Sequence, residues 1–312
     1  MNRPLLSGLA VFALFAVTPL LAGQAVSDSK KVMKEPCPPD TVTYAILDSS
    51  YTADSDFERG DDAHGSSIFN SLEVNRRFLL GPGWPNQECG NWYLRAGLQY
   101  SRWDFDNSGG LPIPNTLQSA AGIIALEYVV NDAPVMMIEA QPGVYFQHDI
   151  DADDIDVPVK IYAPIFVRQG ENSSFAIVAG LTHVGFRTYP LLPVAGVIWR
   201  KDKITLFGVV PEPRLIYSAR PGLDFWISGE LAGGSFRTDG NRYEKKPALN
   251  EAVVTYSEYR AAAGVAWKKD NLVVDIGAGW AFQRKFDYHR AEEGFETDGG
   301  APFVKVELRA GF

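Results

Sequence analysis

Residues 304–312, at the end of the chain, read VKVELRAGF. Apolar residues occupy every second position, and charged residues or glycine stand between them. The apolar set is Val304, Val306, Leu308, Ala310 and Phe312, and the intervening set is Lys305, Glu307, Arg309 and Gly311. Side chains of a β-strand point alternately to its two faces, so this stretch predicts a strand with one apolar face and one polar face.

The same period of two recurs throughout residues 41–312, in segments separated by turn residues. In residues 91–103 one face is formed by Trp92, Leu94, Ala96, Leu98 and Tyr100. The opposite face carries Tyr, Arg, Gly, Gln and Ser, a mixture typical of a barrel lumen rather than of a surface in water. Glycine within strands also fits a curved wall. The sequence therefore predicts an all-β protein, a transmembrane antiparallel up-and-down β-barrel.

Short and long connections between these segments alternate, as they do between the two ends of an outer-membrane barrel. Short connections are expected near residues 131–132, 169–173, 201–202, 220–222 and 269–270. The same phase places residues 54–65 and 104–116 outside and residues 81–90 on the periplasmic side. It yields about fourteen strands, or about twelve if the Pro211 break only interrupts a strand and the segment from Thr41 is not part of the wall.

Two further features agree with this phase. Four tryptophans lie near connections assigned to the periplasmic side, as an interfacial aromatic belt requires: Trp84, Trp92, Trp199 and Trp267. Cys37 and Cys89 fall on that side too. In an oxidising compartment a disulfide is the default for two cysteines, so this pair is a candidate bridge, with two independent thiols as the alternative.

The N-terminus has the build of a secretory signal peptide. Arg3 precedes an apolar run over residues 5–21, and small residues follow at Gly23 and Ala25. We expect cleavage to remove residues 1–25. Residues 26–40 would then form a periplasmic segment ahead of the barrel, which takes up residues 41–312.

A terminal aromatic residue that ends an amphipathic strand resembles the signal that outer-membrane barrels present to their insertion machinery. We therefore expect Phe312 to engage that machinery. Together with the signal peptide, this strand predicts a location in the bacterial outer membrane, in contact with its lipid and lipopolysaccharide.

Residues that could carry catalysis are scattered. The four histidines are His64, His148, His183 and His289. Outer-membrane lipid hydrolases need a serine activated by a histidine, and we expect no such pair here. We therefore expect no enzymatic activity and no cofactor. The formal net charge of −9 argues against nucleic acid as a partner.

One predicted outer loop is strongly acidic. Its aspartates are Asp149, Asp151, Asp153, Asp154 and Asp156. Alternating carboxylates are hard oxygen ligands that calcium can use, although the central glycine and closing glutamate of an EF-hand are absent. A calcium site, bridging to lipopolysaccharide phosphates, is one interpretation, and a solvated acidic loop is the other.

Strand parity directs charged side chains of both signs into the barrel. They are Arg95, Glu139, Lys160, Asp224, Glu230, Glu258, Arg260, Asp275, Lys285, Lys305, Glu307 and Arg309. Mixed charges either line a water-filled passage or form ion pairs that close a narrow lumen. A barrel of this strand number is wider than the eight-strand size that side chains alone can fill, so a passage is favoured.

Residues 191–199 read LLPVAGVIW, and residues 204–211 read ITLFGVVP. This Leu-Pro-x-x-Gly strand, followed by a tight turn and an apolar strand that ends in proline, resembles an uncharacterised family of bacterial outer-membrane β-barrel proteins of unknown function. The resemblance covers roughly residues 191–312. It implies a barrel in the outer membrane, with no activity and no functional residues to carry over.

These features together predict an outer-membrane barrel that acts as a passive channel or transporter for small solutes. Two alternatives stay open. One is a closed structural or adhesive barrel, and the other is a soluble periplasmic β-sandwich that binds a ligand. The solute, the openness of the lumen and the oligomeric state do not follow from the sequence.

Overall fold

The structure is a computed structural model of the 312-residue chain, and it describes residues 41–59, 63–82, 90–130, 133–169, 173–183, 191–289, 291 and 293–312. The expected signal peptide, the segment 26–40, Trp84 and the cysteines Cys37 and Cys89 lie outside these residues.

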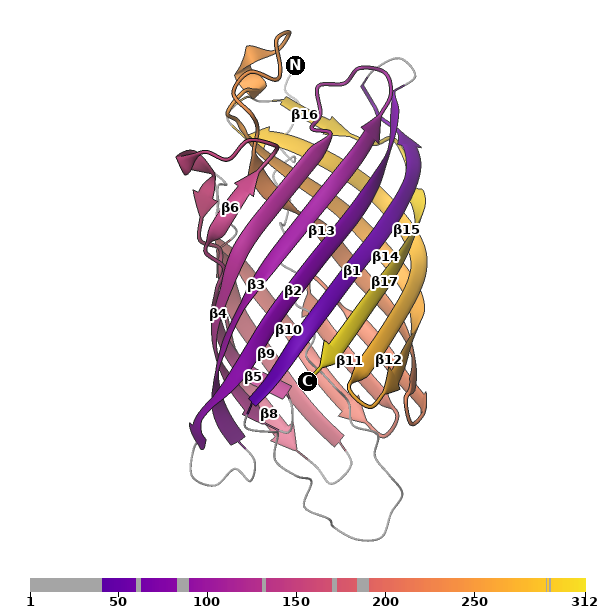
Figure 1. The fold of residues 1–312 in the computed structure, drawn as a ribbon. Helices are drawn as coiled ribbons and strands as arrows, with labels where there is room; N and C mark the ends of the chain where they lie inside the picture. The colour runs from indigo at the N-terminus through magenta and orange to yellow at the C-terminus, as the bar shows by residue number, and fades with distance from the viewer. Residues whose placement is uncertain are drawn as a thin grey trace, which may run out of the picture.

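Fourteen antiparallel strands form one closed wall (Figure 1). The first five are β1 (Thr41–Asp56), β2 (His64–Pro82), β3 (Gly90–Asn107), β4 (Thr116–Val130) and β5 (Ala133–Ala140). The next five are β8 (Val159–Gln169), β9 (Ser173–His183), β10 (Leu191–Lys201), β11 (Ile204–Val210) and β12 (Arg214–Arg220). The last four are β13 (Leu223–Arg237), β14 (Val253–Lys269), β15 (Leu272–His289) and β17 (Ala301–Gly311).

Five short elements lie in the upper connections. They are the strands β6 (Gly143–Phe146), β7 (Ile155–Asp156) and β16 (Glu293–Glu296), and the 3-10 turns η1 (Ala152–Asp154) and η2 (Pro247–Leu249). The barrel closes where β17 pairs antiparallel with β1, from Tyr44 opposite Gly311 to Thr52 opposite Phe303. A wall closed in this way confirms the predicted barrel and rules out the two-sheet sandwich.

The predicted alternation of connections is confirmed. β17 ends at the lower end in Figure 1, the end that also carries the short turns after β10, β12 and β14. These turns contain Asp202, Gly222 and Asp270 with φ of 52°, 78° and 49°, the left-handed conformation that tight hairpins require. Three of the predicted belt tryptophans, Trp92, Trp199 and Trp267, lie toward the lower ends of their strands.

The strand count is the larger of the two expected values. The segment from Thr41 is a full wall strand, with β2 on one side and β17 on the other. The Pro211 break is a turn between β11 and β12, in which the Glu212 N–H donates to the Val209 carbonyl at 3.0 Å.

The outer face of the wall is apolar. On β3, Leu94, Leu98 and Tyr100 expose 37%, 71% and 41% of their surfaces, and on β17 Val304 exposes 52%. Soluble proteins rarely expose a contiguous apolar surface on this scale, so the surface suits the hydrocarbon of a membrane. Among the described residues, no helix is long and apolar enough to cross a membrane.

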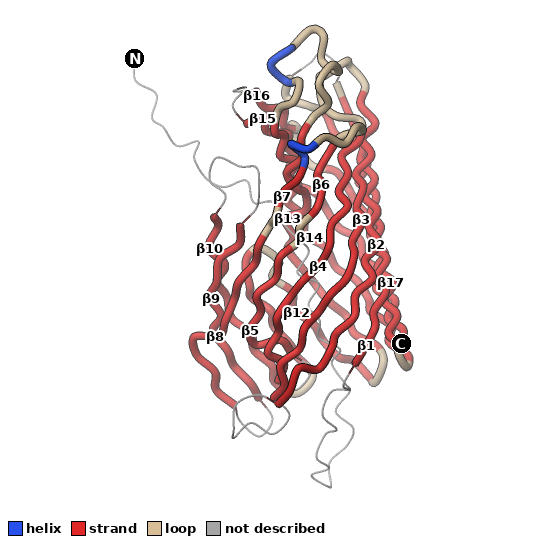
Figure 2. The backbone as a smooth tube through the Cα atoms, turned by 60° about the vertical axis from the view of Figure 1, so that its left-hand side comes forward, coloured by secondary structure: helices blue, strands red, loops and turns tan. Residues whose placement is uncertain are grey.

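The wall is taller on one side than on the other (Figure 2). Strands β1 to β4 have 15 to 19 residues, whereas β8 to β12 have 7 to 11. Above these shorter strands β6 meets β13, where Phe146 and Arg237 form a parallel bridge and Arg237 Nε donates to the Asp153 carbonyl at 3.0 Å. Fewer strands therefore enclose the upper part of the barrel than the lower part.

Candidate functional site

The predicted inward charges lie on the inner face of the wall, with one exception. Buried members are Arg95, Glu139, Lys160, Asp224, Glu258, Arg260 and Asp275. Members with 14% to 18% of the side chain exposed are Glu230, Lys305, Glu307 and Arg309. Burial of so many charges requires partners, and these residues form clusters at different heights.

The exception is Lys285. Between β14 and β15 the register passes from Tyr259 opposite Gln283 to Arg260 opposite Ala281. Phe282 is therefore an extra residue in β15, and such a bulge exchanges the two faces of all residues beyond it. Arg284 consequently faces inward and is 3% exposed, whereas Lys285 faces outward and pairs with Asp287 at 3.6 Å. The parity prediction for Lys285 was wrong for this reason.

A cluster of five charged groups, here called the lower cluster, joins β2, β3, β4 and β5. It consists of Glu73, Arg77, Arg95, Glu127 and Glu139. Glu127 is 0% exposed and lies between two guanidinium groups, with Arg77 Nη2 at 2.8 Å and Arg95 Nε at 2.7 Å. Arg95 also pairs with Glu73 at 3.3 Å and with Glu139. These ion pairs run from strand to strand along the inner face of the wall, so the lower cluster links four neighbouring strands.

A second cluster, here called the middle cluster, joins β1, β13, β14 and β17. It consists of Glu230, Glu258, Arg260 and Lys305. Arg260 pairs with Glu258 at 3.0 Å and with Glu230 at 3.4 Å, and Lys305 Nζ pairs with Glu230 at 2.9 Å. Thr52 of β1 donates to Glu258 at 2.8 Å.

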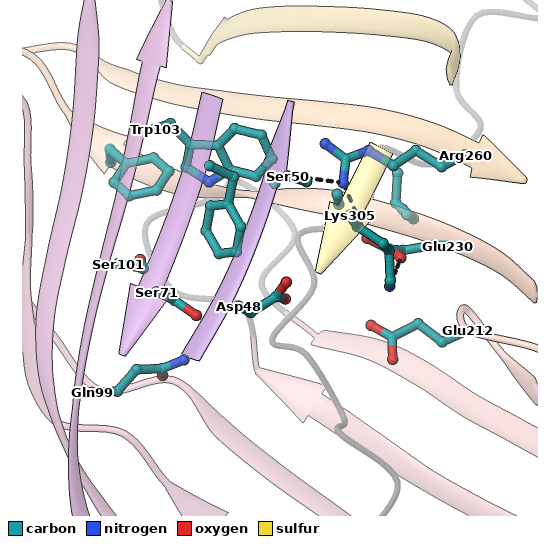
Figure 3. Close-up of a pocket in the computed structure, with 15 residues that line it drawn as sticks. Asp48, Ser50, Ser71, Gln99, Ser101, Trp103, Glu212, Glu230, Arg260 and Lys305 are labelled. Atoms are coloured by element: carbon teal, nitrogen blue, oxygen red, sulfur yellow. Dashed lines mark hydrogen bonds and ion pairs between the residues drawn. The ribbon is translucent and has the colours of Figure 1, made fainter. Parts of the chain in front are cut away.

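A cavity of about 90 Å³ lies beside the middle cluster (Figure 3). A water molecule needs roughly 10–15 Å³ of such volume, so the cavity has room for several. Asp48, Glu212, Glu230, Arg260 and Lys305 line it with charges. Hydroxyl and amide groups of Ser50, Ser71, Gln99 and Ser101 complete its polar surface.

Aromatic side chains close the lumen above this cavity. This aromatic plug contains Trp103, Phe105, Tyr256, Phe286 and Tyr288, each of them at most 8% exposed. Tyr256 is at the centre, with ring centroids 4.8 Å from Trp103, 4.7 Å from Phe105 and 4.9 Å from Phe286.

Two upper loops complete the plug. Ile113, between β3 and β4, and Leu249 of η2 are buried against it. Tyr288 donates to the carbonyl of Pro112 at 2.9 Å. The described part of the lumen is therefore a polar space with a packed apolar ceiling, an arrangement that can hold water and a small solute but is closed toward the upper end.

The acidic loop does not assemble a cation site. Asp154 is buried, accepts from the Asp151 N–H at 2.7 Å and lies 3.9 Å from Arg237. Burial raises the pKa of this carboxyl. Among the described residues, no three His, Cys, Asp or Glu side chains are grouped as metal ligands, so the predicted calcium site at Asp149, Asp151, Asp153, Asp154 and Asp156 has no ligand set here.

One histidine does meet a serine. His64, which also begins a His64-Gly65-Ser66 spacing, lies with Nδ1 2.8 Å from Oγ of Ser108, and this hydroxyl also lies 3.2 Å from the His64 carbonyl oxygen. The expectation that no such pair is present was wrong. The pair lies at the upper rim, where His64 is exposed and Ser108 is half-buried. The expectation of no enzymatic activity stays a prediction.

Several important groups were missed by the parity prediction. Arg77 and Glu127 follow the same alternation as Arg95 and could have been found by extending it to every strand. Asp48 lies on the one strand whose place in the wall was in doubt. Glu212 lies in a turn between two prolines, where alternation carries no information about direction.

Known proteins similar to this chain are found among solved structures. No known family and no curated protein matches the sequence, so the expected family of uncharacterised barrels is not shown. Among solved structures, the chain is similar to the COG4313 outer membrane channel from Pseudomonas putida F1, with 14% identity, a TM-score of 0.45 and coverage of 91% of this chain and 100% of that chain.

Two further structures are similar at a lower level. One is OprB of Pseudomonas putida at low pH, with 7% identity, a TM-score of 0.25 and coverage of 87% of this chain and 92% of that chain. The other is the transport unit of the autotransporter AIDA-I from Escherichia coli, with 9% identity, a TM-score of 0.28 and coverage of 90% and 92%.

Proposed function

We propose that this protein resides in the bacterial outer membrane and acts there as a channel for small polar solutes. The observation that carries the proposal is the charged cavity beside the middle cluster, enclosed by a wall whose outer face is apolar. Lipid accounts for the outer face, and a space with room for water inside a closed wall is the minimum that passage of a polar solute requires.

The aromatic plug defines the resting state of this channel as closed at the upper end. Solute passage requires the plug side chains, or the loops that carry Ile113 and Leu249, to move aside. A small and intermittent conductance is therefore expected, in contrast to the steady conductance of an open pore.

Planar-bilayer recording with refolded, full-length mature protein tests the proposal. We expect discrete openings in 1 M KCl. Folding is checked independently by migration on an SDS gel with and without heating, because membrane barrels resist cold SDS. Persistent electrical silence of protein that migrates as folded would overturn the channel and favour the closed structural or adhesive barrel.

Location needs its own measurement. Cell fractionation with an antibody against the upper loops is expected to place the protein in the outer-membrane fraction. Recovery of folded protein from the soluble periplasmic fraction, without detergent, would contradict both the location and the function.

A further inference from the structure

The charges around the cavity are unbalanced. Its two cations are already neutralised, since Lys305 pairs with Glu230 and Arg260 pairs with Glu230 and Glu258. With Asp48 and Glu212 added, the charged groups that line the cavity comprise three carboxylates and two cations, a formal charge of −1. An enclosed negative space attracts positive solutes.

Asp48 and Glu212 supply the excess. In the described part of the chain, neither carboxylate has an ion pair or a side-chain hydrogen bond, and both point into the cavity (Figure 3). The barrel encloses both of them, and each keeps partial solvent access because the cavity itself has room for water. Lys160 acts on Glu212 and Lys305 acts on Asp48 electrostatically. A carboxylate removed from bulk water is stabilised further by a close cationic partner, so a cation that enters the cavity is favoured at these two groups.

The two carboxylates come from different parts of the wall. Asp48 projects from the middle of β1, where its register neighbours are Ser71 and Glu307. Glu212 projects from the turn above the short strands β11 and β12. A ligand between them would contact both sides of the barrel. On the side of β2 and β3 the cavity is lined by the polar side chains of Ser71, Gln99 and Ser101.

The upper side of the cavity is aromatic and would favour a ligand that has an apolar part. Phe69, Trp103 and Phe236 border the space from above. A metal ion would leave these rings uncovered, and among the described residues no group of three ligands is available to hold one. An ammonium head on a short hydrocarbon chain matches both the paired carboxylates and the rings above them.

We propose that this cavity binds a small organic ammonium, with its charged head between Asp48 and Glu212 and its apolar body against Trp103 and Phe236. The inference rests on the proposed channel function and names the solute class of that channel, organic cations of a few carbon atoms.

Isothermal titration of the folded, detergent-solubilised full-length mature protein with n-butylammonium chloride tests the proposal. We expect saturable binding of butylammonium and none of sodium butyrate at the same ionic strength. Replacement of each carboxylate by its amide, Asp48→Asn and Glu212→Gln, removes charge without changing size. Each variant is expected to bind about tenfold more weakly, and the double variant is expected to show no saturation. Glu244→Gln, at an exposed acid of the upper loop, is the matched control and should bind as the wild type does.

Three results would overturn the inference: no binding of butylammonium, equal binding of butylammonium and butyrate, or undiminished binding by the double variant. Each variant is accepted only if it shows the heat-modifiable migration of the wild type. Because binding is measured without a bilayer, its outcome is independent of conductance. Binding without conductance would overturn the channel alone, whereas conductance without binding would overturn only the ammonium site.

Discussion

The indole Nε1 of Trp226 donates a hydrogen bond to Oδ1 of Asp275 at 2.7 Å, across the strand that lies between them. The ring reaches Asp275 because the intervening positions have no side chains. A Cβ added at Gly277 would lie 2.4 Å from the indole Cη2, and one at Gly264 would lie 2.3 Å from its Cζ2. Arg214 covers the ring at 4.3 Å from its centroid.

This arrangement predicts that Gly277→Ala destabilises the barrel by about 1–3 kcal/mol, since overpacking displaces the ring from its hydrogen bond. In a Trp226→Leu background the same change should cost much less, because the atoms that it meets are gone. The free energy of unfolding in urea, measured with protein in lipid vesicles, gives both values and their coupling.

Gly208→Ala serves as the control for this cycle, because the nearest atom to its added Cβ lies at an ordinary 3.4 Å. It should leave the unfolding free energy within about 0.5 kcal/mol of the wild type. If Gly277→Ala lowers the free energy of unfolding equally with and without Trp226, the indole ring does not occupy the space above this glycine.

Two arginines of β3 allow a comparison of ion pairs within one strand. Arg95 is buried among Glu73, Glu127 and Glu139, whereas Arg102 pairs with Asp104 at 2.7 Å with 45% of its side chain exposed. Arg95→Gln leaves three carboxylates short of a partner, two of them buried (Glu127 and Glu139), and should cost about 3–5 kcal/mol.

Arg102→Gln should cost no more than about 1 kcal/mol, since exposed ion pairs contribute little. Urea unfolding of both variants makes the comparison. A cost for Arg95→Gln as small as that for Arg102→Gln would mean that water reaches the lower cluster freely and screens it, and the lower lumen would then be an open passage.

Alternation along the sequence was sufficient to predict the wall and most of its inner face. On β3 the side chains of Leu94, Leu98 and Arg95 lie where their parity places them, because hydrocarbon outside and polar groups inside impose the same period on every strand. Parity failed at Lys285, where one extra residue, Phe282, reverses the two faces. A bulge has no simple sequence signal, so this error could not be avoided by counting.

Whether the lumen is open or filled by side chains could not be predicted from the sequence, for a different reason. Trp103 and Phe286 read as members of amphipathic strands, with nothing to show that they meet. They are 183 positions apart (286 minus 103), and their contact through Phe105 and Tyr256 depends on the closure of the barrel. The unequal strand lengths, which leave fewer strands around the upper part of the barrel, also depend on tertiary pairing that local patterns do not encode.

The outer face offers a depth-dependent test of membrane contact. Leu98 lies in the middle of β3 and is 71% exposed, and Leu80 lies near the lower end of β2 and is 57% exposed. Arginine at a lipid-facing midplane position costs about 2–4 kcal/mol, and near an interface about 0–1 kcal/mol. Leu98→Arg should therefore destabilise the barrel in vesicles far more than Leu80→Arg. Equal effects would contradict the placement of the bilayer across the middle of the strands.

If the aromatic plug blocks the passage of ions, removal of one of its rings should raise the conductance, whereas removal of a ring on the outer face should not. Phe286 is 1% exposed inside the plug, with its ring 4.9 Å from those of Phe105 and Tyr256. Phe286→Ala opens space within the aromatic plug, so single-channel conductance should rise. The same truncation should cost about 3–5 kcal/mol of stability.

Phe282→Ala, on the outer face of the same strand and 57% exposed, is the matched control and should leave conductance unchanged. If Phe286→Ala folds, as judged by heat-modifiable migration, and conducts no better than Phe282→Ala, the plug is not the barrier and solutes must leave the cavity by a path that avoids these rings.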